Sequence, residues 1–131
     1  MSEHFDTVKE YVLELGFHID EEIADEEIVI VNDADRGIHN LVIDCEDSVV
    51  VIEQLILELP ETAGADTYRR LLQMNRELVF GAFVLDESGA RLLYRNTLAL
   101  ANLDLNELET TINALSLGLA ENGEALLAFA S

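Results

Sequence analysis

The sequence has few of the residues that crosslink or sharply interrupt a chain. Its 131 residues include one cysteine, one proline and no tryptophan. A single cysteine, Cys45, excludes an internal disulfide and disfavours a zinc site built on thiolates. Cys45 ends the largely apolar stretch Leu41–Cys45, which favours a small buried hydrophobic side chain over a redox-active thiol.

Long apolar segments are also missing. No run approaches the roughly 18 apolar residues that would cross a bilayer. The first residues, Met1–His4, are acidic where a secretory signal would be basic and then apolar. We therefore expect a cytoplasmic protein with no direct membrane insertion.

Basic residues are scarce. The chain has 7 Lys and Arg against 27 Asp and Glu, which gives a net charge of −20. Such a charge repels phosphate backbones and anionic lipids, so we expect no nucleic-acid partner. The excess is uneven, because residues 1–62 carry 18 acids and 2 bases and residues 63–131 carry 9 acids and 5 bases. Any surface that attracts acidic groups is therefore expected in the second half.

Motifs for catalysis are missing as well. There is no glycine-rich phosphate loop and no nucleophile elbow, and the three histidines are isolated from one another. The segment Asp33–Gly37 resembles a calcium loop, but its glycine falls one position too early, so a turn is favoured. We expect no enzyme activity, no cofactor and no metal. An enzyme or metal site in the acidic stretch Asp20–Asp35 is the disfavoured alternative.

What the sequence does contain is alternating patterns of helices and strands. Phe5, Val8 and Val12 lie on one face of a predicted helix that begins after Ser2 and ends at Gly16. Apolar residues make up 50% of the chain, and after Gly16 they form short runs separated by turn residues. These runs predict strands at 28–31, 38–45 and 49–59, and at best a short strand at 17–20.

The second half predicts a helix, a hairpin and a last helix. Asp66 is expected to cap a helix that runs to about Glu77, and strands are expected at 79–86 and 91–98. The last helix is expected to begin at Asp104 and to end at Gly123, before a short apolar tail. This order predicts a single α+β domain over residues 1–131, with a largely antiparallel sheet and helices packed on it.

One polar residue stands out on an apolar helix face. Asn75 ends the stretch Leu71–Asn75, and a buried amide must find hydrogen-bond partners. A contact with neighbouring backbone is favoured over a contact with a ligand.

Three segments together resemble a known family. They are Leu71–Asn75 (L-L-x-x-N), Gly81–Leu98 with G-x-F-x-L-D and a glycine turn, and Asn102–Leu108 with L-D-x-x-x-L. This arrangement resembles the type III secretion chaperone superfamily, the CesT/Tir-chaperone-like and YbjN-like proteins. The resemblance implies an α-β-β-β-α-β-β-α order and a homodimer. It also implies that the middle helix and the next strand form the dimer contact, with Tyr68, Leu72, Phe80 and Phe83 as candidates.

The same resemblance implies a function. Such chaperones hold an extended segment of a partner protein over apolar patches and a sheet edge. Candidate partner-binding residues here are Ile38, Val42, Val50 and Ile52. The chain is thus expected to be a protein-binding chaperone or adaptor, with a secretion substrate or a stress-response protein as its partner. The alternative is a YbjN-like regulatory or stress-response interaction module without a secretion role.

Overall fold

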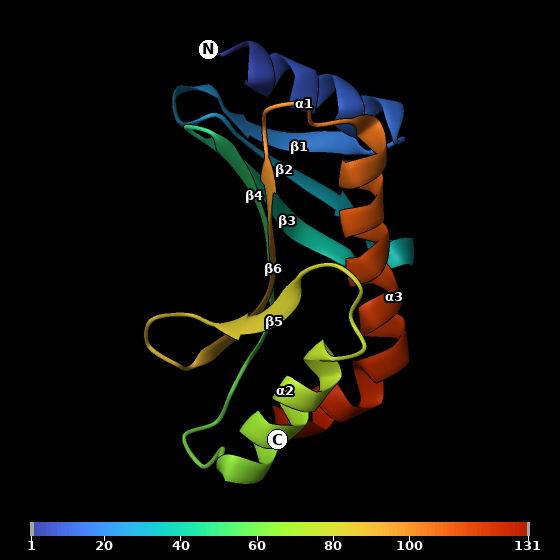
Figure 1. Cartoon of the computed structure of the whole chain (residues 1–131). Coiled ribbons are helices and arrows are strands. Elements are labelled where there is room, and N and C mark those ends of the chain that lie inside the picture. Colours follow the sequence, from blue (N-terminus) through green and yellow to red (C-terminus); the bar gives the residue numbers. More distant parts are fainter. Residues whose placement is uncertain (1, 131) are drawn as a thin grey trace.

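Residues 2–130, which this computed structural model describes, form a six-stranded antiparallel sheet and three α-helices (Figure 1). The strand order across the sheet is β1-β2-β3-β4-β6-β5. The predicted α+β class, with an antiparallel sheet, is confirmed. The elements are α1 (Glu3–Glu14), β1 (His18–Ile23), the short 3₁₀ turn η1 (Ala24–Glu26), β2 (Ile28–Asp33), a second 3₁₀ turn η2 (Ala34–Arg36), β3 (Ile38–Glu46), β4 (Val49–Glu58), α2 (Ala65–Asn75), β5 (Ala82–Leu85), β6 (Arg91–Ala99) and α3 (Leu105–Phe129).

Four strands precede α2, where the order implied by the family resemblance had three and the residue pattern allowed three or four. The additional strand is β1, which continues beyond the predicted short strand into the acidic stretch as far as Ile23. Its pairing with β2 explains the difference, because Ile19 lies opposite Val31 and Ile23 opposite Ile28. Tertiary pairing has outweighed the weak strand propensity of Asp and Glu at an exposed edge.

The first helix has the predicted limits. The Ser2 hydroxyl accepts a hydrogen bond from the backbone N–H of Phe5, which caps the helix. Phe5, Val8 and Val12 are buried against the sheet. Gly16 adopts a left-handed conformation after the helix and turns the chain into β1.

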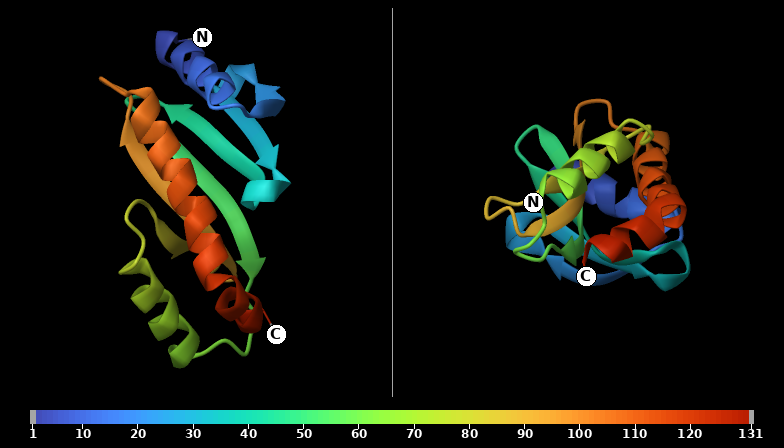
Figure 2. Two further views of the ribbon diagram at one scale, coloured as in Figure 1. Left: turned by 90° about the vertical axis from the view of Figure 1, so that its right-hand side faces the viewer. Right: turned by 90° about the horizontal axis from the view of Figure 1, so that it is seen from below.

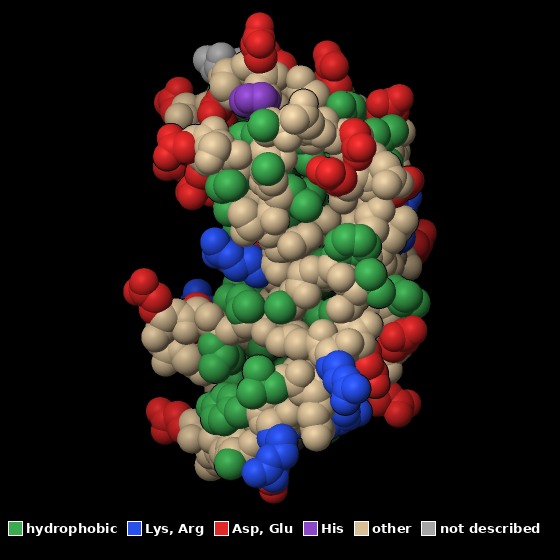
Figure 3. Space-filling model, in the orientation of Figure 1, with side chains coloured by type: hydrophobic (Ala, Val, Ile, Leu, Met, Phe, Trp, Pro, Cys, Tyr) green, Lys and Arg blue, Asp and Glu red, His purple; other side chains and the backbone are tan. Residues whose placement is uncertain are grey.

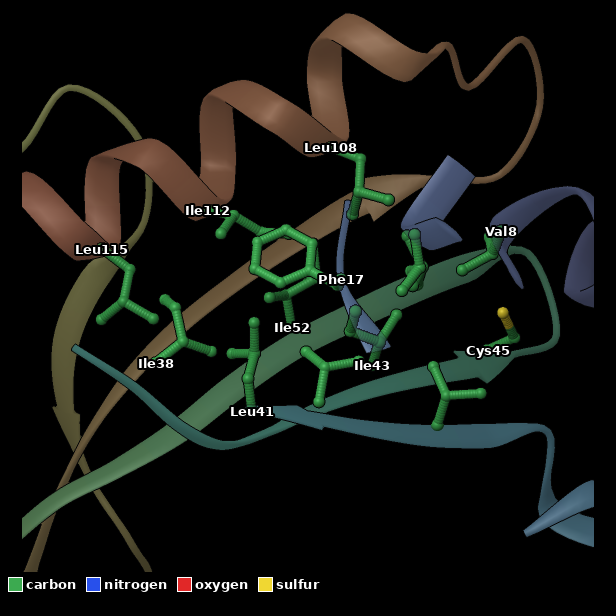
Figure 4. Packing of buried hydrophobic residues seen from close by; sticks show 14 of the residues in the cluster. Val8, Phe17, Ile38, Leu41, Ile43, Cys45, Ile52, Leu108, Ile112 and Leu115 are labelled. Atoms are coloured by element: carbon green, nitrogen blue, oxygen red, sulfur yellow. The ribbon is translucent and has the colours of Figure 1, made fainter. Parts of the chain in front are cut away.

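The main core lies between the sheet and the helices α1 and α3 (Figure 4). Side chains from alternate positions of β2, β3 and β4 point to this face, where they meet Phe17 and α3. The buried side chains that share this face are Val29 and Val31 of β2, Ile38, Leu41, Ile43 and Cys45 of β3, Val50 and Ile52 of β4, and Leu108, Ile112 and Leu115 of α3.

A smaller core lies at the other end of the sheet. It consists of Leu71 and Met74 of α2, Phe83 of β5, Leu92 of β6 and Leu126 of α3. Irregular pairing near Ile56 in β4 re-aims the strand, so that Leu57 packs against this second cluster. Ile56, Leu78 and Leu119 contact both clusters, so the two cores are continuous.

The last helix is longer than predicted. It begins as expected, with the Asp104 carboxylate accepting a hydrogen bond from the Glu107 backbone N–H at 2.8 Å. It does not end at Gly123 but continues to Phe129. Packing of Leu126 in the second core outweighs the cost of a glycine inside a helix, which is about 1 kcal/mol. Figure 2 shows α3 running along one face of the sheet.

Within residues 2–130, no helix combines the length and apolar character that a bilayer crossing requires.

Candidate protein-interaction surface

An apolar groove lies between α2 and the sheet edge at β5. Its volume is about 340 Å³. Its floor is formed by side chains of the second core. Its walls are formed by more exposed side chains of α2 and β5. The lining residues are Tyr68, Leu71, Leu72, Asn75, Phe83, Val84, Leu85 and Leu92.

The side chains of α2 divide between a buried side and a side exposed at the groove. Leu71 and Met74 turn inward and are buried, whereas Leu72 turns outward and is 71% exposed. Tyr68 is 36% exposed one turn before it. An exposed leucine alone would mean little, but these side chains border an apolar hollow and are therefore candidates for contact with another protein.

Asn75 fixes α2 to β5. Its side-chain amide donates to the Phe83 carbonyl oxygen at 3.1 Å and accepts from the Phe83 N–H at 2.7 Å. The predicted contact with neighbouring backbone is confirmed. The amide thus takes the place of a further strand at this residue of the sheet edge, which protects the edge from pairing there.

The segment before β5 approaches Tyr94 of β6 closely. Gly81 has a left-handed conformation, and a Cβ atom there would lie 2.5 Å from the Tyr94 hydroxyl. That hydroxyl lies 2.9 Å from the Phe80 carbonyl oxygen and 3.1 Å from the Thr111 carbonyl oxygen, so it can donate to either. Burial raises the pKa of Tyr94 to about 12, which keeps the hydroxyl protonated as a donor. The family-like Leu71–Asn75 and Gly81–Phe83 segments therefore position α2, β5 and β6 relative to one another.

Of the four predicted dimer residues, Tyr68, Leu72 and Phe83 line this groove. Phe83 is itself buried in the second core. Phe80 lies elsewhere, in a separate hollow of about 350 Å³ formed with the end of β6 and the start of α3. Val79, the neighbour of Phe80 in the sequence, is 79% exposed.

The four predicted partner-binding residues divide between the two faces of the sheet. Ile38, Val50 and Ile52 are buried in the main core, so their side chains are not available to a partner in this structure. They face α3 and the N-terminal segment, because the register of β3 and β4 turns them inward. Val42 lies on the opposite face and is only partly buried.

Burial or an ion pair accounts for three other side chains, namely Cys45, Asp33 and Arg69. Cys45 is buried, and burial raises the pKa of its thiol to about 11, as expected of an inert thiol. The Asp33 carboxylate pairs with Arg36 at 3.0 Å within the predicted turn. Arg69 pairs with Asp66 at 3.6 Å on the surface of α2, although Asp66 itself does not cap the helix, which begins after Gly64.

Charge is distributed as the sequence indicated. In Figure 3, Asp and Glu crowd the upper part of this face, over α1 and the first strands. Lys and Arg side chains are visible lower on this face, at mid-height and around α2, where hydrophobic side chains also gather. The groove between α2 and β5 therefore lies in the less acidic half of the chain.

Comparison with known families agrees with this architecture. The sequence matches the CesT_Tir_1 family over residues 1–131, and the chain belongs to this family. The resemblance to type III secretion chaperones is thereby confirmed. No curated protein matches the sequence significantly.

Solved structures share the fold at low sequence identity. YbjN from E. coli, a proposed transcription regulator, superposes with a TM-score of 0.69 at 16% identity, covering 92% of this chain and 91% of YbjN. The Yersinia pestis type III secretion chaperone SycH, solved with a fragment of YscM2, gives 0.60 at 13% identity, covering 96% and 98%. The chaperone–effector complex of SchA and HopA1 gives 0.62 at 13% identity, covering 89% and 91%.

Proposed function

We propose that this chain is a single-domain, non-catalytic chaperone or adaptor that acts in the cytoplasm as a homodimer and holds an extended segment of a partner protein. The groove between α2 and β5 is the observation that carries the proposal. Its lining residues include no carboxylate, imidazole or thiol, and they present apolar surface that water solvates poorly. Membership of the CesT_Tir_1 family supports a role in protein binding.

The groove suits a second copy of the chain better than a single extended strand. Leu72 and Tyr68 project from a helix, and a helix on a two-fold axis can pack against its own copy. Backbone pairing at β5 is restricted because Asn75 already occupies the N–H and carbonyl of Phe83. The groove therefore favours filling by side chains, as in a helix-mediated dimer.

The opposite edge of the sheet is the better place for strand addition. Within residues 2–130, β1 pairs with β2 alone, so its outer backbone groups have no strand partner. Asp20 and Glu21 on this edge are exposed, and such charges oppose indiscriminate pairing. A partner segment added at β1 would continue the sheet without disturbing the proposed dimer surface.

Replacing Leu72 with Arg tests the dimer. Light scattering coupled to size-exclusion chromatography should give twice the mass of one chain for the unchanged protein and a single-chain mass for Leu72→Arg. The matched control is Leu13→Arg on α1, since Leu13 is also exposed, at 57%, but lies at the other end of the molecule. A single-chain mass for the unchanged protein, or a dimer that survives Leu72→Arg, contradicts the proposal.

The identity of the partner distinguishes the two functional alternatives. Crosslinking of the native dimer followed by mass spectrometry should recover a discrete protein joined through a segment without regular folded structure. A secreted protein supports the chaperone role, and a stress-response protein supports a YbjN-like regulatory module. Crosslinks only to folded surfaces contradict the holding of an extended segment.

A further inference from the structure

The face of the sheet opposite the main core is open. In the left view of Figure 2, α3 lies in front of the sheet, and this second face is turned away from the viewer. Because side chains alternate along a strand, residues that neighbour the buried ones point to it. They include Ile28 and Ile30 of β2, Val42, Asp44 and Glu46 of β3, Val51 and Glu53 of β4, and Arg95 of β6.

Branched apolar side chains from three neighbouring strands share this open face. Ile30 lies opposite Val42 in the neighbouring strand, and Val51 of β4 lies opposite Asp44. Ile30 and Val42 are partly buried, and Val51 is buried although it belongs to neither core cluster. Branched side chains in adjacent strands thus make a shallow apolar floor on which no described helix lies.

Carboxylates surround this floor. A hollow of about 240 Å³ is lined by Val42, Asp44, Glu46, Val51, Glu53 and Arg95. Arg95 pairs with Glu53 at 2.8 Å, which leaves Asp44 and Glu46 without a basic partner among the described residues. The hollow therefore carries uncompensated negative charge beside apolar surface.

We propose that the open face binds a partner segment in which Lys or Arg and branched apolar residues lie on the same side. The apolar side chains would cover Ile30 and Val42, which are partly exposed, and the basic groups would pair with Asp44 and Glu46. This deepens the proposed function by stating the chemistry of the partner and a contact surface separate from the α2–β5 groove.

Charge complementarity selects this occupant. A second copy would bring another acidic face against Asp44 and Glu46, and like charges would repel. Burial and the nearby carboxylates of Glu46, Glu26 and Glu53 raise the pKa of Asp44 to about 6. A Lys or Arg beside Asp44 would lower that pKa, so binding of a cation relieves an unfavourable arrangement already present in the free protein.

Synthetic peptides test the proposal. The probe is an end-blocked, fluorescent peptide with Ser at every second position and Val alternating with Lys at the others, so that Val and Lys share one side when it is extended. Fluorescence anisotropy at low salt should show binding that weakens by about tenfold or more in Asp44→Asn/Glu46→Gln. Peptides with Gln or Glu in place of Lys should bind the unchanged protein more weakly than the Lys peptide does.

A matched double variant controls for the overall field of the protein. Glu121→Gln/Glu124→Gln removes two exposed charges from α3, on the helix-covered side of the sheet. This variant should keep the affinity of the unchanged protein. Equal losses in both double variants, or equal binding of the Lys and Gln peptides, would overturn the proposal. Amide chemical-shift changes confined to β3 and β4 would support it, and changes confined to α2 and β5 would overturn it.

The outcome separates the two proposals. A dimer that crosslinks to an extended partner but ignores the Lys peptide overturns the open-face proposal alone. A chain that remains single and binds neither partner nor peptide overturns both.

Discussion

The two ends of the sheet use their apolar residues differently. Around α1 and the first four strands, apolar side chains form a large closed core, and the surface above them is dominated by carboxylates. Around α2 and β5 the core is small, and Leu72 and Leu85 remain at the surface beside the groove. The difference indicates that the first region supplies most of the folding free energy, while the second keeps apolar surface for contact with another chain.

Truncating one side chain in each region is the strongest test of this division. Ile43→Ala in the main core should lower the free energy of unfolding by about 2–5 kcal/mol, because Ile43 is fully buried and a cavity would remain. Leu72→Ala should cost about 0.5 kcal/mol or less in the single chain, because its side chain is exposed. Urea unfolding at several protein concentrations measures both.

Concentration dependence provides the control. The cost of Ile43→Ala should not change with protein concentration, whereas the cost of Leu72→Ala should grow as concentration favours the dimer. A large cost for Leu72→Ala at the lowest concentration would mean that Leu72 supports the single chain and that the two regions do not differ as described.

Loss of the hydrogen bonds between Asn75 of α2 and Phe83 of β5 should have the next largest effect on stability. Asn75→Ala removes both hydrogen bonds to Phe83 and should destabilise the chain by about 1–3 kcal/mol, since a partly buried N–H and carbonyl lose their partners. Asn75→Asp keeps an acceptor for the N–H but places a carboxylate against the Phe83 carbonyl oxygen. Hydrogen exchange of the Phe83 amide should therefore be fast in Asn75→Ala and intermediate in Asn75→Asp. Unchanged exchange in both variants would show that Asn75 does not protect the edge.

The sequence predicted the elements better where local signals agreed with packing. The spacing of Phe5, Val8 and Val12 and the cap at Ser2 were sufficient for α1, because that helix buries one regular face. Gly123 was a misleading stop signal, because glycine propensity is a local term and the burial of Leu126 is a tertiary one. The pattern indicated at best a short strand at 17–20, and the acidic second half of β1 could not be recognised alone, since pairing with β2 is what makes it a strand.

The candidate sites show a similar limit. Both faces of β4 are apolar near its start, so the pattern indicated a central strand, and β4 is indeed paired on both sides. It did not indicate which face the helices cover. The prediction named Ile38, Val50 and Ile52, which face the helices, together with Val42, which faces the open side. A shift of one residue exchanges the two faces of a strand, so only knowledge of register resolves the choice.

The smallest expected effect is on the pH dependence of stability. It compares the carboxyl of Asp44 with that of Asp86 in the β5–β6 turn. The Asp44 pKa is raised from 3.8 to about 6, so the folded chain holds the proton more tightly than the unfolded chain between these values. Stability from this group therefore falls as pH rises from about 4 to about 6. Asp44→Asn should raise the melting temperature at pH 7 and leave it nearly unchanged near pH 3.

Asp86 should respond with the opposite sign. Hydrogen bonds from the Ser88 hydroxyl and from backbone N–H groups, including that of Arg91, lower the pKa of its carboxyl. Its contribution is present above the unfolded pKa and is lost as pH falls through the folded one, so Asp86→Asn should lower the melting temperature at pH 7. Calorimetric scans of both variants from pH 3 to pH 7 measure the difference. Loss of stability in Asp44→Asn at pH 7 would show that the Asp44 carboxylate is already stabilised in the free protein. A basic partner would then gain nothing by pairing with it.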